Sequence, residues 1–74
     1  MSNILISKKT VEEFLTEDTT LDIAKRDEIM NTLSEIEAKE GRKWVFTPQT
    51  SKFYIDEYNQ YNDFVKTYIF KNGQ

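Results

Sequence analysis

The feature that most constrains this chain is a block of aromatic residues in its second half. Nine of the ten aromatic side chains of the 74-residue sequence lie between Trp44 and Phe70, and Phe14 lies outside that block. A chain of this length is expected to form one domain, residues 1–74, with only a small core. We therefore expect the aromatic block to supply most of the core and much of any surface that binds a partner.

Two helices are predicted ahead of the block. Thr10 followed by Glu13 matches a capping box, which predicts a short helix over about residues 11–17. Residues 18–20 offer N-cap side chains for a second helix over about 20–40, whose apolar residues recur at three- and four-residue spacing. Gly41 stands where a glycine typically ends such a helix. Upstream, residues 3–6 fit either an edge strand or an apolar arm laid on the core.

The aromatic block begins with a predicted β-hairpin. Two β-prone segments, 43–47 and 52–55, flank the turn-like residues 48–51. From residue 57 onward two signals conflict, because the residue types favour a strand whereas the tyrosines and Val65 recur at steps of four and three residues, as in a helix. We predict a C-terminal helix over about 57–71, with a third antiparallel strand at 64–70 as the alternative. The predicted fold class is a small α+β domain.

The composition argues against an enzyme, a metal protein and a bound cofactor. The sequence has no His and no Cys, which are the commonest general acid–base residue and the usual zinc ligands. Its two glycines lie 32 positions apart, so no phosphate-binding loop is present. No apolar stretch approaches the roughly 18 residues of a membrane span, and the N-terminus does not read as a signal peptide. We expect a soluble cytoplasmic protein with no membrane partner.

Charge is unevenly distributed along the chain. The net charge is −3, and residues 1–43 account for it, because acidic and basic residues balance over 44–74. This acidic balance argues against nucleic acid as a partner, since nucleic-acid binding requires clustered Lys and Arg. Five acidic residues with no basic residue among them form either a solvated face or an acidic edge that steers the chain towards a basic partner. They are Glu12, Glu13, Glu17, Asp18 and Asp22.

The aromatic side chains exceed what a small core needs. Five large residues of the block are assigned to the core, namely Trp44, Phe46, Phe53, Phe64 and Ile69. The tyrosine hydroxyl groups need a partner or water, and Tyr is enriched in protein interfaces. We therefore predict that Tyr54, Tyr58 and Tyr61 form a patch that contacts another protein, with the core edge as the alternative location. Stacking on single-stranded nucleic acid is less favoured, because no Lys or Arg lies between Phe53 and Val65.

Two short segments carry a family resemblance. Gly41-Arg-Lys-Trp-Val-Phe46 resembles the wing strand of small winged-helix proteins of the excisionase and MerR type, and Thr10-Val-Glu-Glu-Phe-Leu15 resembles their opening helix. The resemblance implies a winged-helix-like fold and a nucleic-acid partner contacted through Arg42, Lys43 and Lys52. The second helix departs from the pattern, because it is short and basic in that family and is predicted to be long and acidic here.

Taken together, these patterns favour a small regulatory or inhibitory protein that binds another protein. Short chains with one dense aromatic block and no catalytic parts are common among phage and mobile-element products. The predicted contact surface is the tyrosine patch with its acidic edge. Two other functions are carried forward: a winged-helix nucleic-acid binder, and a structural component that assembles as a homo-oligomer.

Overall fold

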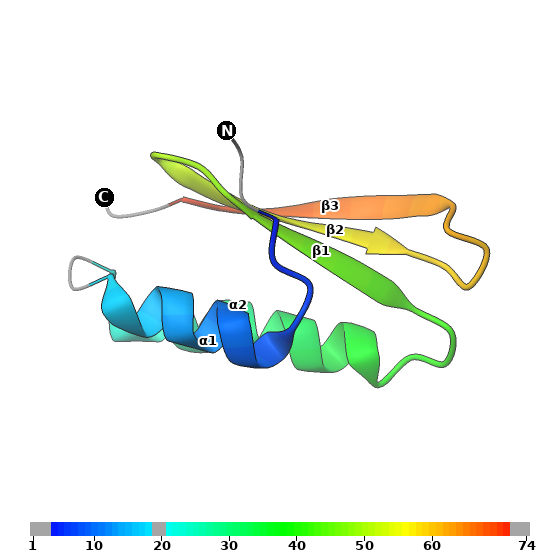
Figure 1. Ribbon diagram of the computed structural model, residues 1–74, viewed down its shortest axis with the longest axis horizontal. Coiled ribbons are helices and arrows are strands. Elements are labelled where there is room, and N and C mark those ends of the chain that lie inside the picture. Colours follow the sequence, from blue (N-terminus) through cyan, green and yellow to red (C-terminus); the bar gives the residue numbers. More distant parts are fainter. Residues whose placement is uncertain (1–3, 19–20, 72–74) are drawn as a thin grey trace.

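A computed structural model describes residues 4–18 and 21–71 of the chain. Its elements follow the order α1 (Lys8–Glu17), α2 (Ile23–Glu37), β1 (Lys43–Pro48), β2 (Lys52–Tyr58) and β3 (Phe64–Lys71). The strands form one antiparallel sheet in the order β1-β2-β3, and both helices lie on the same side of it (Figure 1). The predicted α+β class is confirmed as two helices packed on a three-stranded sheet.

Helix α1 begins earlier than predicted. Its N-cap is Ser7, and the Thr10 hydroxyl donates a hydrogen bond to the Ser7 carbonyl at 2.8 Å. Thr10 therefore lies inside the first turn, and the predicted capping box between Thr10 and Glu13 is wrong. The helix buries Val11 and Leu15 against the sheet, as their four-residue spacing requires.

Helix α2 is shorter at both ends than the predicted 20–40. Its N-cap is Asp22, whose carboxylate accepts a hydrogen bond from the Ala24 amide at 3.1 Å. Thr19 and Thr20, which we also considered as N-caps, lie outside the described residues. The helix ends at Glu37, and Gly41 belongs to the following loop, where its φ of +76° favours glycine. A Cβ at Gly41 would lie 2.9 Å from the Gln60 side-chain oxygen, so the loop and not the helix end requires this residue.

The predicted C-terminal helix over 57–71 is wrong, and the alternative strand at 64–70 is confirmed. Strand β2 continues to Tyr58, and β3 pairs with it from Lys71 back to Phe64, with an irregular register next to Glu57. The segment forms a strand despite its helical spacing, because pairing with β2 buries one face of β3 and provides hydrogen-bond partners for its backbone N–H and C=O groups. The other face of β3 is left exposed, so Phe64 and Ile69 are not core residues as we predicted.

The core lies between the helices and the inner face of the sheet. It contains Val11, Leu15, Ile29, Leu33, Ile36, Trp44, Phe46, Phe53, Ile55 and Phe70. The core assignment of Trp44, Phe46 and Phe53 is therefore confirmed. Phe14, on α1, stands edge-on to the rings of Phe46 and Phe53, each at 6.2 Å between centroids. This T-shaped arrangement joins α1 to β1 and β2.

The N-terminal arm, residues 4–6, adds to the edge of β1. Leu5 and Phe46 exchange two backbone hydrogen bonds of 2.8 Å, and the Leu5 side chain packs against the core. Residues 4–6 therefore form a single β-bridge and not an edge strand, with Leu5 laid on the core as the apolar-arm alternative expects; Asn3 lies outside the described residues. Within the described residues, neither helix has the length and apolar character needed to cross a membrane.

Candidate binding surface

The side of the sheet away from the helices is the candidate binding surface, here called the outer face. Successive side chains of a strand point to opposite faces, and the buried residues fix which set points inwards. The outward set is Lys43, Val45 and Thr47 on β1, Lys52, Tyr54, Asp56 and Tyr58 on β2, and Thr67, Ile69 and Lys71 on β3. Phe64 joins this set, out of the alternation of β3, because the register shift after Glu57 pairs it with Tyr58. No helix of the described chain covers this face (Figure 1).

Large apolar side chains are exposed on the outer face. Phe64 is 60% exposed and Ile69 is 58% exposed. The Phe64 ring packs edge-on against Tyr58 with 6.1 Å between centroids, and Ile69 lies directly across from Tyr54. Ile4 and Ile6, on either side of Leu5, are also exposed at the edge of β1. These exposed groups form an apolar and aromatic surface of the kind that marks interaction sites.

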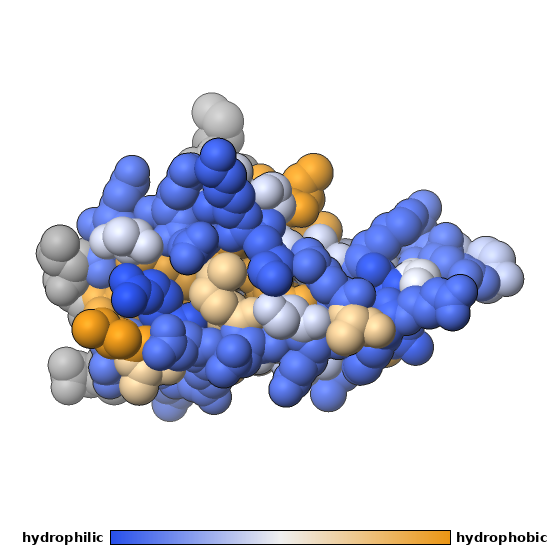
Figure 2. All heavy atoms as spheres, turned by 90° about the horizontal axis from the view of Figure 1, so that it is seen from below, coloured by the Kyte–Doolittle hydropathy of each residue, from blue (hydrophilic) through white to orange (hydrophobic). Residues whose placement is uncertain are grey.

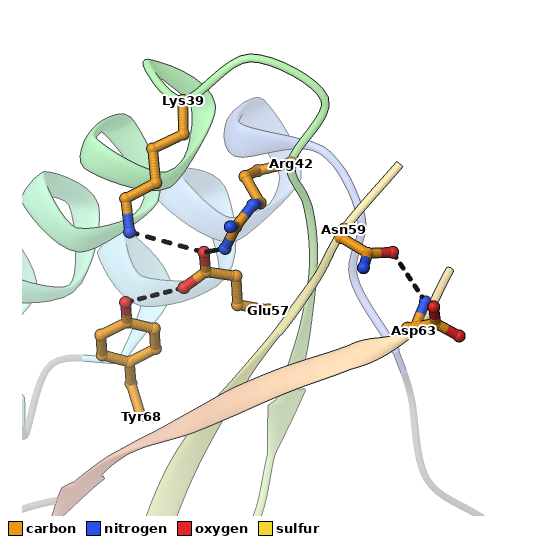
Figure 3. Close-up of polar contacts among 6 residues, drawn as sticks. All are labelled: Lys39, Arg42, Glu57, Asn59, Asp63 and Tyr68. Atoms are coloured by element: carbon orange, nitrogen blue, oxygen red, sulfur yellow. Dashed lines mark hydrogen bonds and ion pairs between the residues drawn. The ribbon is translucent and has the colours of Figure 1, made fainter. Parts of the chain in front are cut away.

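The turn between β2 and β3 holds Tyr61 at one end of the outer face. The Asn59 side-chain oxygen accepts a hydrogen bond from the Tyr61 backbone amide at 2.9 Å. It accepts a second one from the Asp63 backbone amide at 3.0 Å (Figure 3). The Asn59 backbone amide donates a hydrogen bond to the Asp63 backbone carbonyl at 3.0 Å, which closes the turn. Tyr61 is 74% exposed at this turn. A closed turn of this kind limits the entropy lost when the tyrosine binds a partner.

On the opposite side of the sheet, the buried carboxylate of Glu57 ties the sheet to the end of α2. Its Oε2 accepts from Arg42 Nη1 at 2.6 Å and lies 3.5 Å from Lys39 Nζ, and its Oε1 accepts from the Tyr68 hydroxyl at 2.8 Å (Figure 3). The side chain is fully buried. These partners come from β3 and from the loop after α2, so the network fixes the sheet that carries the outer face.

The network shifts the acidity of both buried groups. Burial alone would raise the pKa of Glu57, but the hydrogen bonds from Tyr68 and Arg42 and the charge of Lys39 outweigh it, so the pKa lies below its ordinary value. Burial, together with the hydrogen bond to the Glu57 carboxylate, raises the pKa of Tyr68. Glu57 is therefore a paired structural anion at neutral pH and not a proton donor.

The helix layer and the sheet differ in net charge. Seen from the helix side, the surface is predominantly hydrophilic (Figure 2). Residues 8–40, which contain both helices, hold five basic and ten acidic residues, a net charge of −5. Residues 41–71, which contain the sheet, hold five basic and three acidic residues, a net charge of +2. The two layers thus carry opposite net charges, although the whole chain is acidic.

The structure separates the two parts of the predicted contact surface. Tyr54 and Tyr58 lie on the outer face, and Tyr61 lies in the turn at its end. The acidic residues Glu12, Glu13, Glu17, Asp18 and Asp22 belong to α1 and to the connection before α2. They lie in the helix layer, so they do not form a rim around the tyrosines.

The three basic residues of the nucleic-acid alternative are likewise not gathered in one place. Arg42 and Lys43 line an open groove of about 550 Å³ at the start of β1, together with Trp44 and Tyr58. Arg42 is engaged by Glu57, and Lys43 donates to the Asn62 side chain at 2.9 Å. Lys52 begins β2 and lies at the other end of the sheet, roughly 20 Å away by the rise per residue of a strand.

Phe64 and Ile69 are surface residues that sequence reasoning placed in the core. The available signal was that a strand at 64–70 puts bulky groups on both faces, so one set must be exposed when helices cover only one side.

In the described part of the chain, no three acidic side chains converge to hold a metal ion. Comparisons with protein-family models, curated proteins and solved structures gave no match for this chain.

Proposed function

We propose that this chain is a small regulatory or inhibitory protein that acts by binding another protein through its outer face. The observation that carries the proposal is the exposure of Phe64 and Ile69 beside Tyr54 and Tyr58, on the side of the sheet that neither helix covers. Aromatic side chains of this kind supply most of the free energy of protein interfaces when they enter a partner pocket. Burying them on a partner also removes the cost of leaving them in water.

The proposed mechanism is steric docking of a rigid surface. Hydrogen-bonded strands hold the side chains of the outer face, and the Glu57 network ties β2 and β3 to the end of α2. Tyr61, at the end of the face, adds an aromatic anchor with few rotatable bonds. Because these groups are already in place, binding needs little ordering of the chain, and the partner site is simply covered.

The test is affinity capture from a lysate of the encoding organism with matched variants. Tyr61→Ala combined with Phe64→Ala removes two exposed anchors, and Ile23→Ala removes an exposed apolar side chain from the helix layer. We expect a protein that is retained by the wild type and by Ile23→Ala, with affinity reduced about tenfold or more by the double variant. Circular dichroism should show all three chains folded. If every captured protein is retained equally by the double variant, the proposal is wrong.

A further inference from the structure

Two lysines stand directly opposite each other at one end of the outer face. Lys52 and Lys71 are cross-strand partners of β2 and β3, and both are exposed. The Lys52 carbonyl accepts from the Gln49 amide, so the Lys52 backbone points towards β1 and the pair with Lys71 is a non-hydrogen-bonded one. In such pairs the Cα atoms are only about 4.5 Å apart and the side chains are closest.

This pair of like charges is not compensated within the described chain. No acidic side chain of the described residues forms an ion pair with Lys52 or Lys71. Like charges directly across an antiparallel ladder destabilise the sheet. An anion placed between the two ammonium groups would relieve that repulsion. Their immediate neighbours on the face are Tyr54 and Ile69, so an apolar contact surface adjoins the charged pair.

The charges of the outer face also decide against a second copy of this chain as the occupant. Lys43, Lys52 and Lys71 outweigh Asp56 on the face, so two outer faces brought together would repel each other. Asp56, whose carboxylate accepts from Thr67 at 2.6 Å, would also become buried against its own copy. The free edge of β3 is interrupted by the irregular register at Glu57 and carries lysines, which disfavours pairing with another strand.

We propose that the outer face binds an acidic segment of another protein, with a carboxylate seated between Lys52 and Lys71 and apolar side chains laid on Tyr54 and Ile69. This inference rests on the proposed function and names the chemistry of the partner. It reverses the sequence-based expectation of a basic partner, because the fold carries the acidic residues away from the tyrosines.

The test is selection from a random peptide library on the immobilised chain, followed by fluorescence anisotropy of the selected peptides. The selected peptides should be enriched in Asp and Glu relative to the input library. Lys52→Glu should weaken their binding about tenfold, while its thermal midpoint stays equal to or above that of the wild type, because an opposite-charge pair replaces a like-charge pair. Lys9→Glu, on the exposed face of α1, makes the same change in net charge and should leave binding unchanged.

Four outcomes would overturn the inference. Peptides that depend on Phe64 but show no acidic enrichment would defeat it while leaving the proposed function intact. Recovery of no peptide would defeat both. An equal loss from Lys9→Glu would show that net charge, and not the lysine pair, is responsible. Tighter binding of a labelled thymidine oligonucleotide of about twelve nucleotides, with the same dependence on Lys52, would assign the face to nucleic acid instead.

Discussion

Replacing Glu57 by Gln tests whether the buried network holds the two layers together. The variant keeps the shape of the side chain but removes its charge, so the short bonds from Arg42 and Tyr68 lose their charge-assisted character. Each such bond is worth about 1 kcal/mol more than its neutral counterpart. Lys39 and Arg42 are partly exposed and regain water, which limits the further cost. We expect a loss of about 2–3 kcal/mol in the free energy of unfolding, out of a total of about 4–11 kcal/mol for a chain of this size.

Urea denaturation followed by the fluorescence of Trp44, the single tryptophan, measures this loss directly. The matched control is Glu28→Gln, which removes an exposed carboxylate 3.3 Å from Lys25 on the surface of α2. That surface pair should contribute less than about 0.5 kcal/mol. If Glu57→Gln costs no more than Glu28→Gln, the network does not stabilise the fold and the reasoning is refuted.

Three further perturbations follow from the same contacts. The folded-state pKa of Glu57 lies below its ordinary value of 4.5, so the ionised carboxylate stabilises the fold above that pH and this contribution is lost as the pH falls through the folded-state pKa. The difference in unfolding free energy between the wild type and Glu57→Gln should therefore disappear in acid. Tyr68→Phe leaves Glu57 Oε1 without that donor and should lower the free energy of unfolding, measured by urea denaturation, by about 1–2 kcal/mol. Because the pKa of Tyr68 is raised in the folded state, the wild type should lose stability as the pH rises past 10, and the Tyr68→Phe variant should not show this loss. Gly41→Ala forces a side chain into a φ of +76° and should lower the free energy of unfolding by about 1 kcal/mol, whereas no loss would show that the loop relaxes freely.

Local patterns were sufficient to predict the helices, the hairpin and part of the core. The stripe that contains Ile29, Leu33 and Ile36 identified α2, and the β-prone segments on either side of residues 48–51 identified the hairpin. The end of α1 at residue 17 was predicted correctly, whereas its start and both ends of α2 were misplaced. The starts were misplaced because Ser7 and Asp22 compete with other capping residues close by. Such competition is decided by tertiary packing and not by local propensity.

The C-terminal third was predicted as a helix, with the strand as the alternative, because its tyrosines and Val65 fall by coincidence at helical spacing. The tyrosines that seem to form one helical stripe lie on different surfaces: Tyr54 and Tyr58 on the outer face, Tyr61 in a turn, and Tyr68 on the inner face against Glu57. Only the register of β3 against β2 separates them. The same register creates the Lys52–Lys71 pair from residues that are 19 positions apart in the sequence.

The three tyrosines predicted to form a contact patch differ in exposure, because Tyr61 is exposed and Tyr54 and Tyr58 are half-buried. The acidic residues near α1 were expected to form an edge beside the tyrosines, whereas the structure places them in the helix layer. Similarly, Glu57 was predicted to lie in the C-terminal helix, and no local pattern marked it as buried, since Arg42 lies 15 residues before it and Tyr68 lies 11 residues after it. Long-range pairings of this kind leave no local pattern in a single sequence.

Because the two layers carry opposite net charges, the sheet attracts negatively charged partners although the whole chain has a net charge of −3. The layers are stacked along the intermediate dimension of the molecule, 26 Å (Figure 1). Across this full extent, charges on the far side of the helices lie well beyond the Debye length of about 8 Å at physiological ionic strength, so a partner that approaches the outer face responds mainly to the sheet. An acidic partner is therefore repelled by the helices and attracted by the sheet. Near 0.01 M salt the Debye length grows to about 30 Å and both layers act together, so Lys9→Glu, which should be neutral at physiological salt, should slow association only at low ionic strength.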